Sequence, residues 1–156
     1  MRRILFLVWA ILVLAILNLL IIKKEETLAN GKTMLLKLAP VDPRSLMQGD
    51  YMILRYAIAR EDTQNLKSSG HIVVKLDNNK VASFVRLHNG ESLASDEHLL
   101  FYRNRGGMRL GAESYFFQEG DASLYANAQY GELKVDESGE SVLVGLRNAS
   151  YVPLKK

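Results

Sequence analysis

The sequence predicts a mostly β (α+β) protein, in which an N-terminal transmembrane helix is followed by a small antiparallel β sandwich or barrel with one short helix. Three observations predict this class. Residues 4–22 form 19 consecutive uncharged positions with one strongly polar side chain. Beyond them, short apolar segments alternate with turn sequences, as in antiparallel hairpins. One alanine-rich stretch after Asp121 breaks this alternation.

The apolar run has the dimensions of a membrane-spanning helix. At a rise of about 1.5 Å per residue it is about 28 Å long, against a hydrocarbon core of about 30 Å. Apolar residues surround it on every side, so we expect it to cross the bilayer rather than lie on it. Arg2 and Arg3 also suit a cleaved signal peptide, but the long run and the charged residues 23–26 favour a retained anchor. Asn18 either bonds a partner helix or reaches the headgroups.

Four segments follow from this assignment: a short N-terminal arm (1–3), a signal-anchor helix (4–22), a polar stalk (23–32) and an extracytoplasmic β-rich domain (33–156). Basic residues on the two sides of the span are nearly balanced, so the positive-inside rule does not fix its orientation. We expect the short arm to stay inside, as in bacterial signal-anchors, which leaves the large domain periplasmic or extracellular.

Composition excludes several kinds of function. The chain has no cysteine, which excludes a disulfide framework, a thiol catalyst and a Cys-ligated metal site. Two of the 20 Lys and Arg precede the span, and the rest nearly balance the 17 Asp and Glu. Because nucleic-acid binding needs a concentrated basic face, we expect no nucleic-acid partner.

The part beyond the stalk is organised as strands and hairpins. A first strand is predicted over residues 33–38, and a long central strand, apolar on both faces, over residues 50–60. A helix is predicted over residues 121–129, with Asp121 as its N-cap and Gly131 ending it. Three hairpins are predicted from turn residues between apolar segments: 71–76 with 80–87, 99–103 with 108–110, and 131–135 with 141–146.

Several sequence blocks resemble one family. Residues 49–56, GDYMILRY, match the motif that names the GDYXXLXY family of bacterial proteins at its five specified positions. Residues 40–44, 109–120 and 130–146 are similar to that family as well. The resemblance implies a membrane-anchored bacterial domain of unassigned function, of a kind often encoded with polytopic membrane proteins. It supplies no catalytic residues.

The candidate binding or motif residues are Asp42, Arg44, Asp50, Tyr51, Tyr56, Arg109 and Glu119. We expect a non-enzymatic, single-pass domain anchored in the bacterial cytoplasmic (inner) membrane, acting as an accessory or stabilising subunit of a membrane protein complex. Its partners would be the lipid bilayer and a polytopic membrane protein, and we expect no cofactor or metal. The alternative is a small ligand- or envelope-polymer-binding module that uses Asp50, Tyr51, Arg109 and Glu119.

A second alternative is a signal-peptidase-like Ser/Lys hydrolase. Such enzymes resemble this chain in placing a Ser shortly before a Gly-Asp strand start, and Ser45 precedes Gly49 and Asp50 here. They carry Ser-Met-x-Pro, however, whereas Ser45 is followed by Leu-Met-Gln. The base would be Lys75 or Lys80, and solvation of the turn at Lys80 would keep its amine protonated.

Two clusters of ring side chains have a structural and a functional interpretation. His71, His88 and His98 lack the spacing of metal ligands, so we expect them at exposed strand ends. The aromatic residues 115–117 form either a surface patch for a partner or the packing of the short helix against the sheet.

The basic turn at residues 103–109 also leaves two interpretations open. It is either a hairpin loop with solvated arginines or an anion-binding concavity that meets anionic lipid or an acidic loop of a partner. Arg109 could pair with Glu113 or Glu119.

Overall fold

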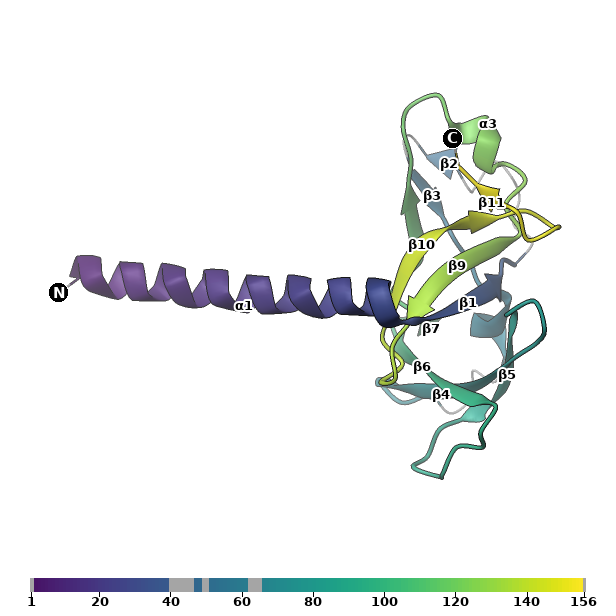
Figure 1. Cartoon of the computed structure of the whole chain (residues 1–156), viewed down its shortest axis with the longest axis horizontal. Helices are drawn as coiled ribbons and strands as arrows, with labels where there is room; N and C mark the ends of the chain where they lie inside the picture. The colour runs from purple at the N-terminus through teal and green to yellow at the C-terminus, as the bar shows by residue number, and fades with distance from the viewer. Residues whose placement is uncertain (1, 40–46, 49–50, 62–65, 156) are drawn as a thin grey trace.

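The computed structural model describes residues 2–39, 47–48, 51–61 and 66–155. A long helix, α1 (Arg2–Asn30), projects from one side of a β domain (Figure 1). The elements that follow α1 are, in chain order, β1 (Lys32–Lys37), β2 (Met47–Gln48), β3 (Tyr51–Ile53), η1 (Ala57–Arg60, a 3-10 helix), β4 (Ser69–Leu76), β5 (Ala82–Leu87), β6 (Glu97–Asn104), β7 (Met108–Arg109), β8 (Ser114–Phe116), α3 (Ala122–Tyr125), β9 (Tyr130–Val135), β10 (Ser141–Arg147) and β11 (Pro153–Leu154).

The predicted fold class is confirmed: an apolar helix is followed by antiparallel sheets and the short helix α3. Within the described residues, the strands form three sheets, in the orders β1-β9-β10-β11, β2-β3-β8 and β5-β4-β6-β7. All strand pairs within these sheets are antiparallel, and an isolated parallel bridge between Leu35 and Val81 joins the first sheet to the third. The sheets curve around one side-chain core, with β1, β9 and β10 opposite β4, β5 and β6 (Figure 1).

Alternation along the strands determines what enters this core. In β9, Gly131, Leu133 and Val135 are buried, while the residues between them are half-buried. Strand β1 differs, because Met34, Leu35 and Leu36 are all buried. The second face of β1 is covered by the turn that precedes β5. There the Leu35 N–H donates to the Lys80 carbonyl at 2.8 Å. One continuous core therefore joins the sheets.

Helix α1 continues beyond the apolar run. The expected stalk is helical through its charged residues to Asn30, because Lys and Glu are good helix formers. The chain then turns at Gly31, at the predicted turn signal. Within the apolar run, the Asn18 amide donates to the Leu14 carbonyl of the same helix at 2.8 Å. The sequence predicted a partner helix or the headgroups for this amide, and not its own helix.

The three predicted hairpins are present, as β4–β5, β6–β7 and β9–β10. The first turn contains a positive φ at Lys80 (65°), and not at the preceding Asn residues that tolerate this conformation. The Asp77 carboxylate stabilises the turn by accepting the N–H groups of Asn79 and Val81, both at 2.8 Å.

The predicted long strand over residues 50–60 is wrong. Strand β3 ends at Ile53, and η1 begins at Ala57. The predicted alternation holds nonetheless: Met52, Leu54, Tyr56 and Ile58 are buried. The opposite face is not buried, since Tyr51 and Ile53 are half-buried and Arg55 is exposed. After Ile53 the backbone leaves β8, and Tyr56 instead forms an isolated bridge to Leu38.

The predicted helix over residues 121–129 is also too long. Helix α3 begins after Asp121 as predicted but ends at Tyr125, and Gly131 lies inside β9. A helix of a single turn has little stability of its own. Tertiary packing stabilises it here, because the buried Tyr125 ring contacts Tyr115 at 5.1 Å and Phe117 at 5.3 Å between centroids. The packing interpretation of the aromatic cluster is thus confirmed for these two rings.

Candidate functional site

The junction between α1 and the β domain is held by side chains from distant parts of the chain. Thr27 is 2 % exposed, and its hydroxyl lies 3.2 Å from Asp136 Oδ2 in the β9–β10 turn. The same hydroxyl lies 3.0 Å from the Lys23 carbonyl, one helical turn earlier. Lys24 forms an ion pair with Glu140 at 3.3 Å. The helix end is therefore fixed to β9 and β10.

Gly31 permits this close attachment. A Cβ atom at this position would lie 2.3 Å from the Thr27 carbonyl oxygen and 3.1 Å from the Val135 backbone nitrogen. The Gly31 N–H donates to Thr27 O at 2.9 Å, and Lys134 Nζ donates to Gly31 O at 3.1 Å. Because the obstructing atoms are backbone atoms, a larger residue would displace the helix from the sheet.

Asp136 organises the turn that receives the helix. Its Oδ1 accepts the Ser138 hydroxyl at 2.6 Å and the N–H groups of Ser138 and Glu140, both at 3.0 Å. Burial by itself would raise the pKa of Asp136, but the hydrogen bonds from Ser138, Glu140 and Thr27 hold it below the ordinary value. The carboxylate is thus ionised and occupied by structural hydrogen bonds.

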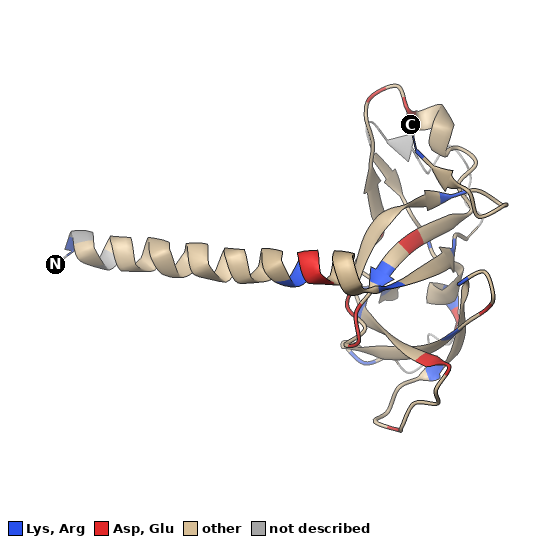
Figure 2. Cartoon of the chain, viewed as in Figure 1, with Lys and Arg blue, Asp and Glu red and all other residues tan. Residues whose placement is uncertain are grey.

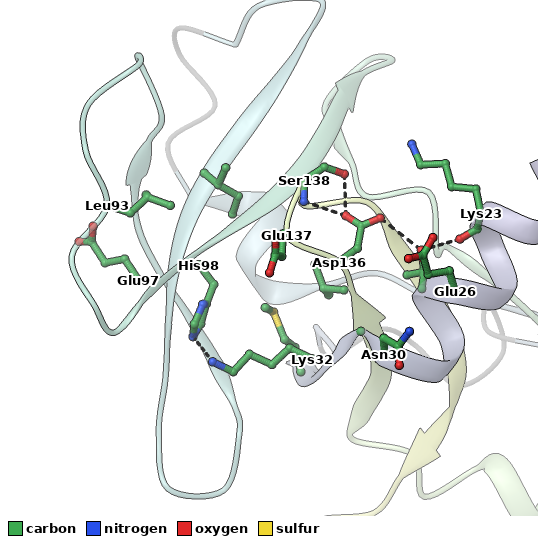
Figure 3. A pocket seen from close by; sticks show the side chains of 15 residues that line it. Lys23, Glu26, Asn30, Lys32, Leu93, Glu97, His98, Asp136, Glu137 and Ser138 are labelled. Carbon is green, nitrogen blue, oxygen red and sulfur yellow. Dashed lines mark hydrogen bonds between the residues drawn. The ribbon is translucent and has the colours of Figure 1, made fainter.

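Beside these contacts lies a groove of about 840 Å³, which we call the junction groove (Figure 3). Figure 2 shows that charged residues gather where α1 meets the β domain, whereas most of the helix carries none. The groove is lined by Lys23, Glu26, Thr27, Asn30, Gly31, Lys32, Met34, Leu93, Glu97, His98, Leu99, Val135, Asp136, Glu137 and Ser138.

His98 is the titratable ring of the junction groove. Its Nε2 lies 2.8 Å from Lys32 Nζ (Figure 3). Since a lysine ammonium can only donate, Nε2 accepts and the ring proton is assigned to Nδ1. Burial and the nearby Lys32 charge lower the pKa of His98, against a smaller opposing effect of Asp96. The ring is therefore neutral near pH 7.

Glu97, at the rim of the junction groove, is bound to Arg86. The guanidinium donates to both carboxylate oxygens, at 2.6 and 3.0 Å, and this lowers the pKa of Glu97 to about 2. The Ala94 N–H donates to the same carboxylate at 3.1 Å. This side chain ties β5 to β6 across β4.

A second groove, of about 590 Å³, lies at the base of α1 beside the β6–β7 hairpin. We call it the basic groove; it is lined by Lys24, Phe101, Arg103, Arg105, Arg109, Leu110, Gly111, Glu113, Glu140 and Ser141. The turn between its strands contains positive φ angles at Gly106 (69°) and Gly107 (128°), which favour glycine. Among the described candidate residues from the sequence analysis, Arg109 lines this groove.

The other candidate residues have different environments. Asp42, Arg44, Asp50 and the proposed nucleophile Ser45 lie outside the described residues. Tyr51 is half-buried and stacks on the exposed Phe116 at 5.8 Å between centroids. Glu119 is exposed. Neither Tyr51 nor Glu119 lines either of these grooves.

Tyr56, the last motif residue, is part of the core. It is 2 % exposed, and its hydroxyl donates to the Ala112 carbonyl at 2.6 Å. Burial raises the pKa of Tyr56, and the Glu113 charge raises it further. The ring lies against Gly131, where a Cβ would approach it to 2.9 Å. These contacts give the motif tyrosine a structural role.

The structure differs from the sequence analysis in the pairing of Arg109 and in the exposure of the histidines. Among the residues that the structure describes, neither Glu113 nor Glu119 forms an ion pair with Arg109. The histidines are half-buried rather than exposed, and the His71 and His88 rings lie 6.4 Å apart between centroids. In the described part of the chain, no group of three or more His, Asp or Glu side chains is placed to hold a metal ion.

The proposed lysine bases of a hydrolase are both exposed. Lys75 forms an ion pair with Asp96 at 3.0 Å. Lys80 lies in the β4–β5 turn, as predicted.

The sequence did not reveal the pairing of Thr27 with Asp136, which are separated by 109 positions. The only signal was that both residues occur beside predicted turns, at the end of the anchor and after a strand. Nothing in their spacing indicates that these turns meet.

Comparison with known proteins identifies the family. The GDYXXLXY protein family model matches residues 13–146. This chain belongs to the GDYXXLXY family. The match covers most of the chain, so the resemblance seen in residues 49–56 is confirmed. No curated protein and no solved structure matches the chain.

Proposed function

We propose that this GDYXXLXY protein is a non-enzymatic, single-pass subunit of a bacterial cytoplasmic membrane complex. Helix α1 stays in the bilayer with its N-terminus inside, and the β domain lies on the periplasmic or extracellular surface. There it stabilises or assists a polytopic membrane protein, which it contacts through the junction groove.

The exposed apolar surface of α1 supports the anchoring. The span Phe6–Asn30 is long and apolar enough to cross a membrane, and 0 % of its most apolar window is buried within the chain. A continuous apolar surface of this size is unfavourable in water. A lipid bilayer would cover it over a length that matches the hydrocarbon core.

The rigid junction is the observation that carries the accessory role. Hydrogen bonds and an ion pair tie the helix end to β9 and β10, through Asp136 and Glu140. A domain attached in this way presents a fixed face at a fixed height above the bilayer. That is useful for binding a membrane-embedded partner, whereas a soluble ligand would be bound equally well by a domain on a flexible linker.

Occupied carboxylates in the grooves support a non-catalytic role. Asp136, Glu97 and Glu140 are each engaged by hydrogen bonds or ion pairs within the chain. General acid–base catalysis needs a group with a pKa near the working pH that can reach a substrate. The lowered pKa values of Asp136 and Glu97 make both side chains poor proton donors at neutral pH.

Site-specific crosslinking in native membranes tests the accessory role. A photoreactive amino acid at Glu137, in the junction groove, should capture one polytopic membrane protein. The same amino acid at Ser150, which is exposed and outside the groove, is the matched control. No capture of a membrane protein from Glu137, or equal capture from both positions, would contradict the proposal.

Cysteine accessibility tests the orientation. Because the chain has no cysteine, a single Ser150→Cys substitution provides the one thiol without further changes. We expect a membrane-impermeant maleimide to label it in spheroplasts as fully as in lysed cells. Labelling only after lysis would place the domain in the cytoplasm.

A further inference from the structure

The basic groove gathers cationic side chains from two distant parts of the chain. Lys24 comes from the end of α1, and Arg103, Arg105 and Arg109 come from the β6–β7 hairpin. The helix and the hairpin thus both line one depression of about 590 Å³. This volume lies in the range of small-ligand sites.

The three arginines of this groove have no carboxylate partner among the described residues. The acidic residues of the groove have other partners than these arginines: Glu140 pairs with Lys24, and Glu113 accepts the Leu110 N–H. Two arginines outside the groove are neutralised, since Arg86 and Arg147 each donate two hydrogen bonds to one carboxylate. The basic groove therefore has an excess of positive charge that the fold itself does not neutralise.

The hairpin that presents these arginines is well ordered by its own contacts. The Asn104 side chain accepts the Gly107 N–H at 3.1 Å, and the Arg105 N–H donates to the Gly107 carbonyl at 3.0 Å. The Arg103 guanidinium lies 5.5 Å from the centre of the Phe101 ring. The backbone that carries Arg105 and the guanidinium of Arg103 therefore lose less conformational freedom when the groove binds an anion.

The position of Lys24 along α1 indicates how far the groove lies from the hydrocarbon core of the bilayer. Lys24 lies two residues beyond the apolar run, which is about 3 Å along a helix. The headgroup layer of a bilayer extends about 5–8 Å beyond the hydrocarbon core. If α1 spans the bilayer, the side of the groove formed by Lys24 lies within this layer, where lipid phosphate groups are found.

We propose that the basic groove binds the phosphate of an anionic phospholipid headgroup, in the leaflet beneath the β domain. Arg105 and Arg109 donate hydrogen bonds to the phosphate oxygens, and Arg103 adds positive charge. This site rests on the membrane anchoring of the proposed function but not on the presence of a protein partner. It adds a lipid contact to the rigid junction.

Native mass spectrometry of the full chain in detergent micelles tests this site. We expect phosphatidylglycerol to bind in preference to phosphatidylcholine, with one molecule retained per chain. The double variant Arg105→Gln/Arg109→Gln should weaken phosphatidylglycerol binding by about 30-fold, because each basic residue at an anionic surface contributes about a factor of five. The charge-preserving variant Arg105→Lys/Arg109→Lys should keep most of the preference.

The matched control is Arg55→Gln/Arg60→Gln, which removes the same charge from two exposed arginines outside the groove. It should bind phosphatidylglycerol as the unchanged chain does.

Equal binding by the groove variant and the unchanged chain would overturn the proposal, as would equal losses in the groove and control variants. Displacement of the lipid by an equal concentration of inorganic phosphate would show a free-phosphate site and overturn the assignment to lipid. A lipid preference without any crosslinked protein would support this site while contradicting the accessory role.

Discussion

The segment that names the family and the junction at the end of α1 differ in what their residues do. Of the three described motif residues, Leu54 and Tyr56 are 1 % and 2 % exposed and belong to the core, whereas Tyr51 is half-buried. The junction instead holds hydrogen-bonded and ion-paired polar groups beside an open groove. A sequence motif can thus mark the part of a domain that is hardest to change for folding, while the surface available to partners lies elsewhere.

The largest expected effect is in the core. Tyr56→Ala should lower the free energy of unfolding by about 3–5 kcal/mol, because it removes a large buried side chain. Tyr56→Phe should cost about 1–3 kcal/mol, since it leaves the buried Ala112 carbonyl without its hydrogen bond. Denaturant unfolding of the full chain in detergent micelles measures both. Equal stability of the unchanged chain and Tyr56→Phe would show that this hydrogen bond is not important.

Gly31→Ala should disrupt the junction and leave the core intact. The new Cβ would meet the Thr27 carbonyl, so we expect the helix end to move and the free energy of unfolding to fall by about 1–3 kcal/mol. Hydrogen exchange of residues 27–37 should accelerate, while exchange in β4 and β6 should not. Gly145→Ala is the control, because a Cβ there meets nothing within 4 Å; its effect should stay within about 0.5 kcal/mol.

Thr27→Val should weaken the junction less than Gly31→Ala. It keeps the shape of the side chain but removes the hydroxyl near Asp136, at a cost of about 0.5–1.5 kcal/mol. The effect should depend on pH. Because hydrogen bonds hold the folded-state pKa of Asp136 below its ordinary value of 3.8, its contribution is complete above about pH 4 and is lost as the pH falls through the folded value. Unfolding measured from pH 7 down to about pH 2 tests this; an effect of Thr27→Val that does not diminish at the acidic end of this range would contradict it.

The smallest expected effect concerns His98. Its pKa is lowered in the folded state, so the unfolded chain binds protons more readily below the ordinary value of 6.5. Stability should therefore fall slightly as the pH decreases from 6.5 towards the folded value. His98→Gln should reduce this fall, measured by thermal unfolding between pH 8 and pH 5.5. A pH dependence unchanged by the substitution would assign it to other groups.

Local sequence patterns predicted much of the fold. The hairpin at β9–β10 was evident from alternating apolar residues around a turn, and the alternation of Met52, Leu54 and Tyr56 correctly identified a buried face. The length of β3 was not predictable, because the strand ends where its pairing partner changes. That change depends on where β8 lies, which is set by distant contacts.

The candidate sites were less predictable than the fold. Arg109 was identified as part of a basic turn, but its proximity to Lys24 arises only when the helix end meets β10. Thr27 and Asp136 carry no individual signal, since polar residues at turns are common. Contacts between turns far apart in the sequence depend on the complete fold.

The distance between the membrane helix and the β domain provides the most direct test of the central claim, that α1 continues as a rigid helix into the domain at the bilayer surface. Because the chain has no cysteine, spin labels can be attached at Leu12→Cys and Ser150→Cys alone. The labelled protein is then reconstituted in lipid bilayers. Electron paramagnetic resonance should give one narrow distance distribution. A broad distribution, as expected for a flexible stalk, would contradict the account.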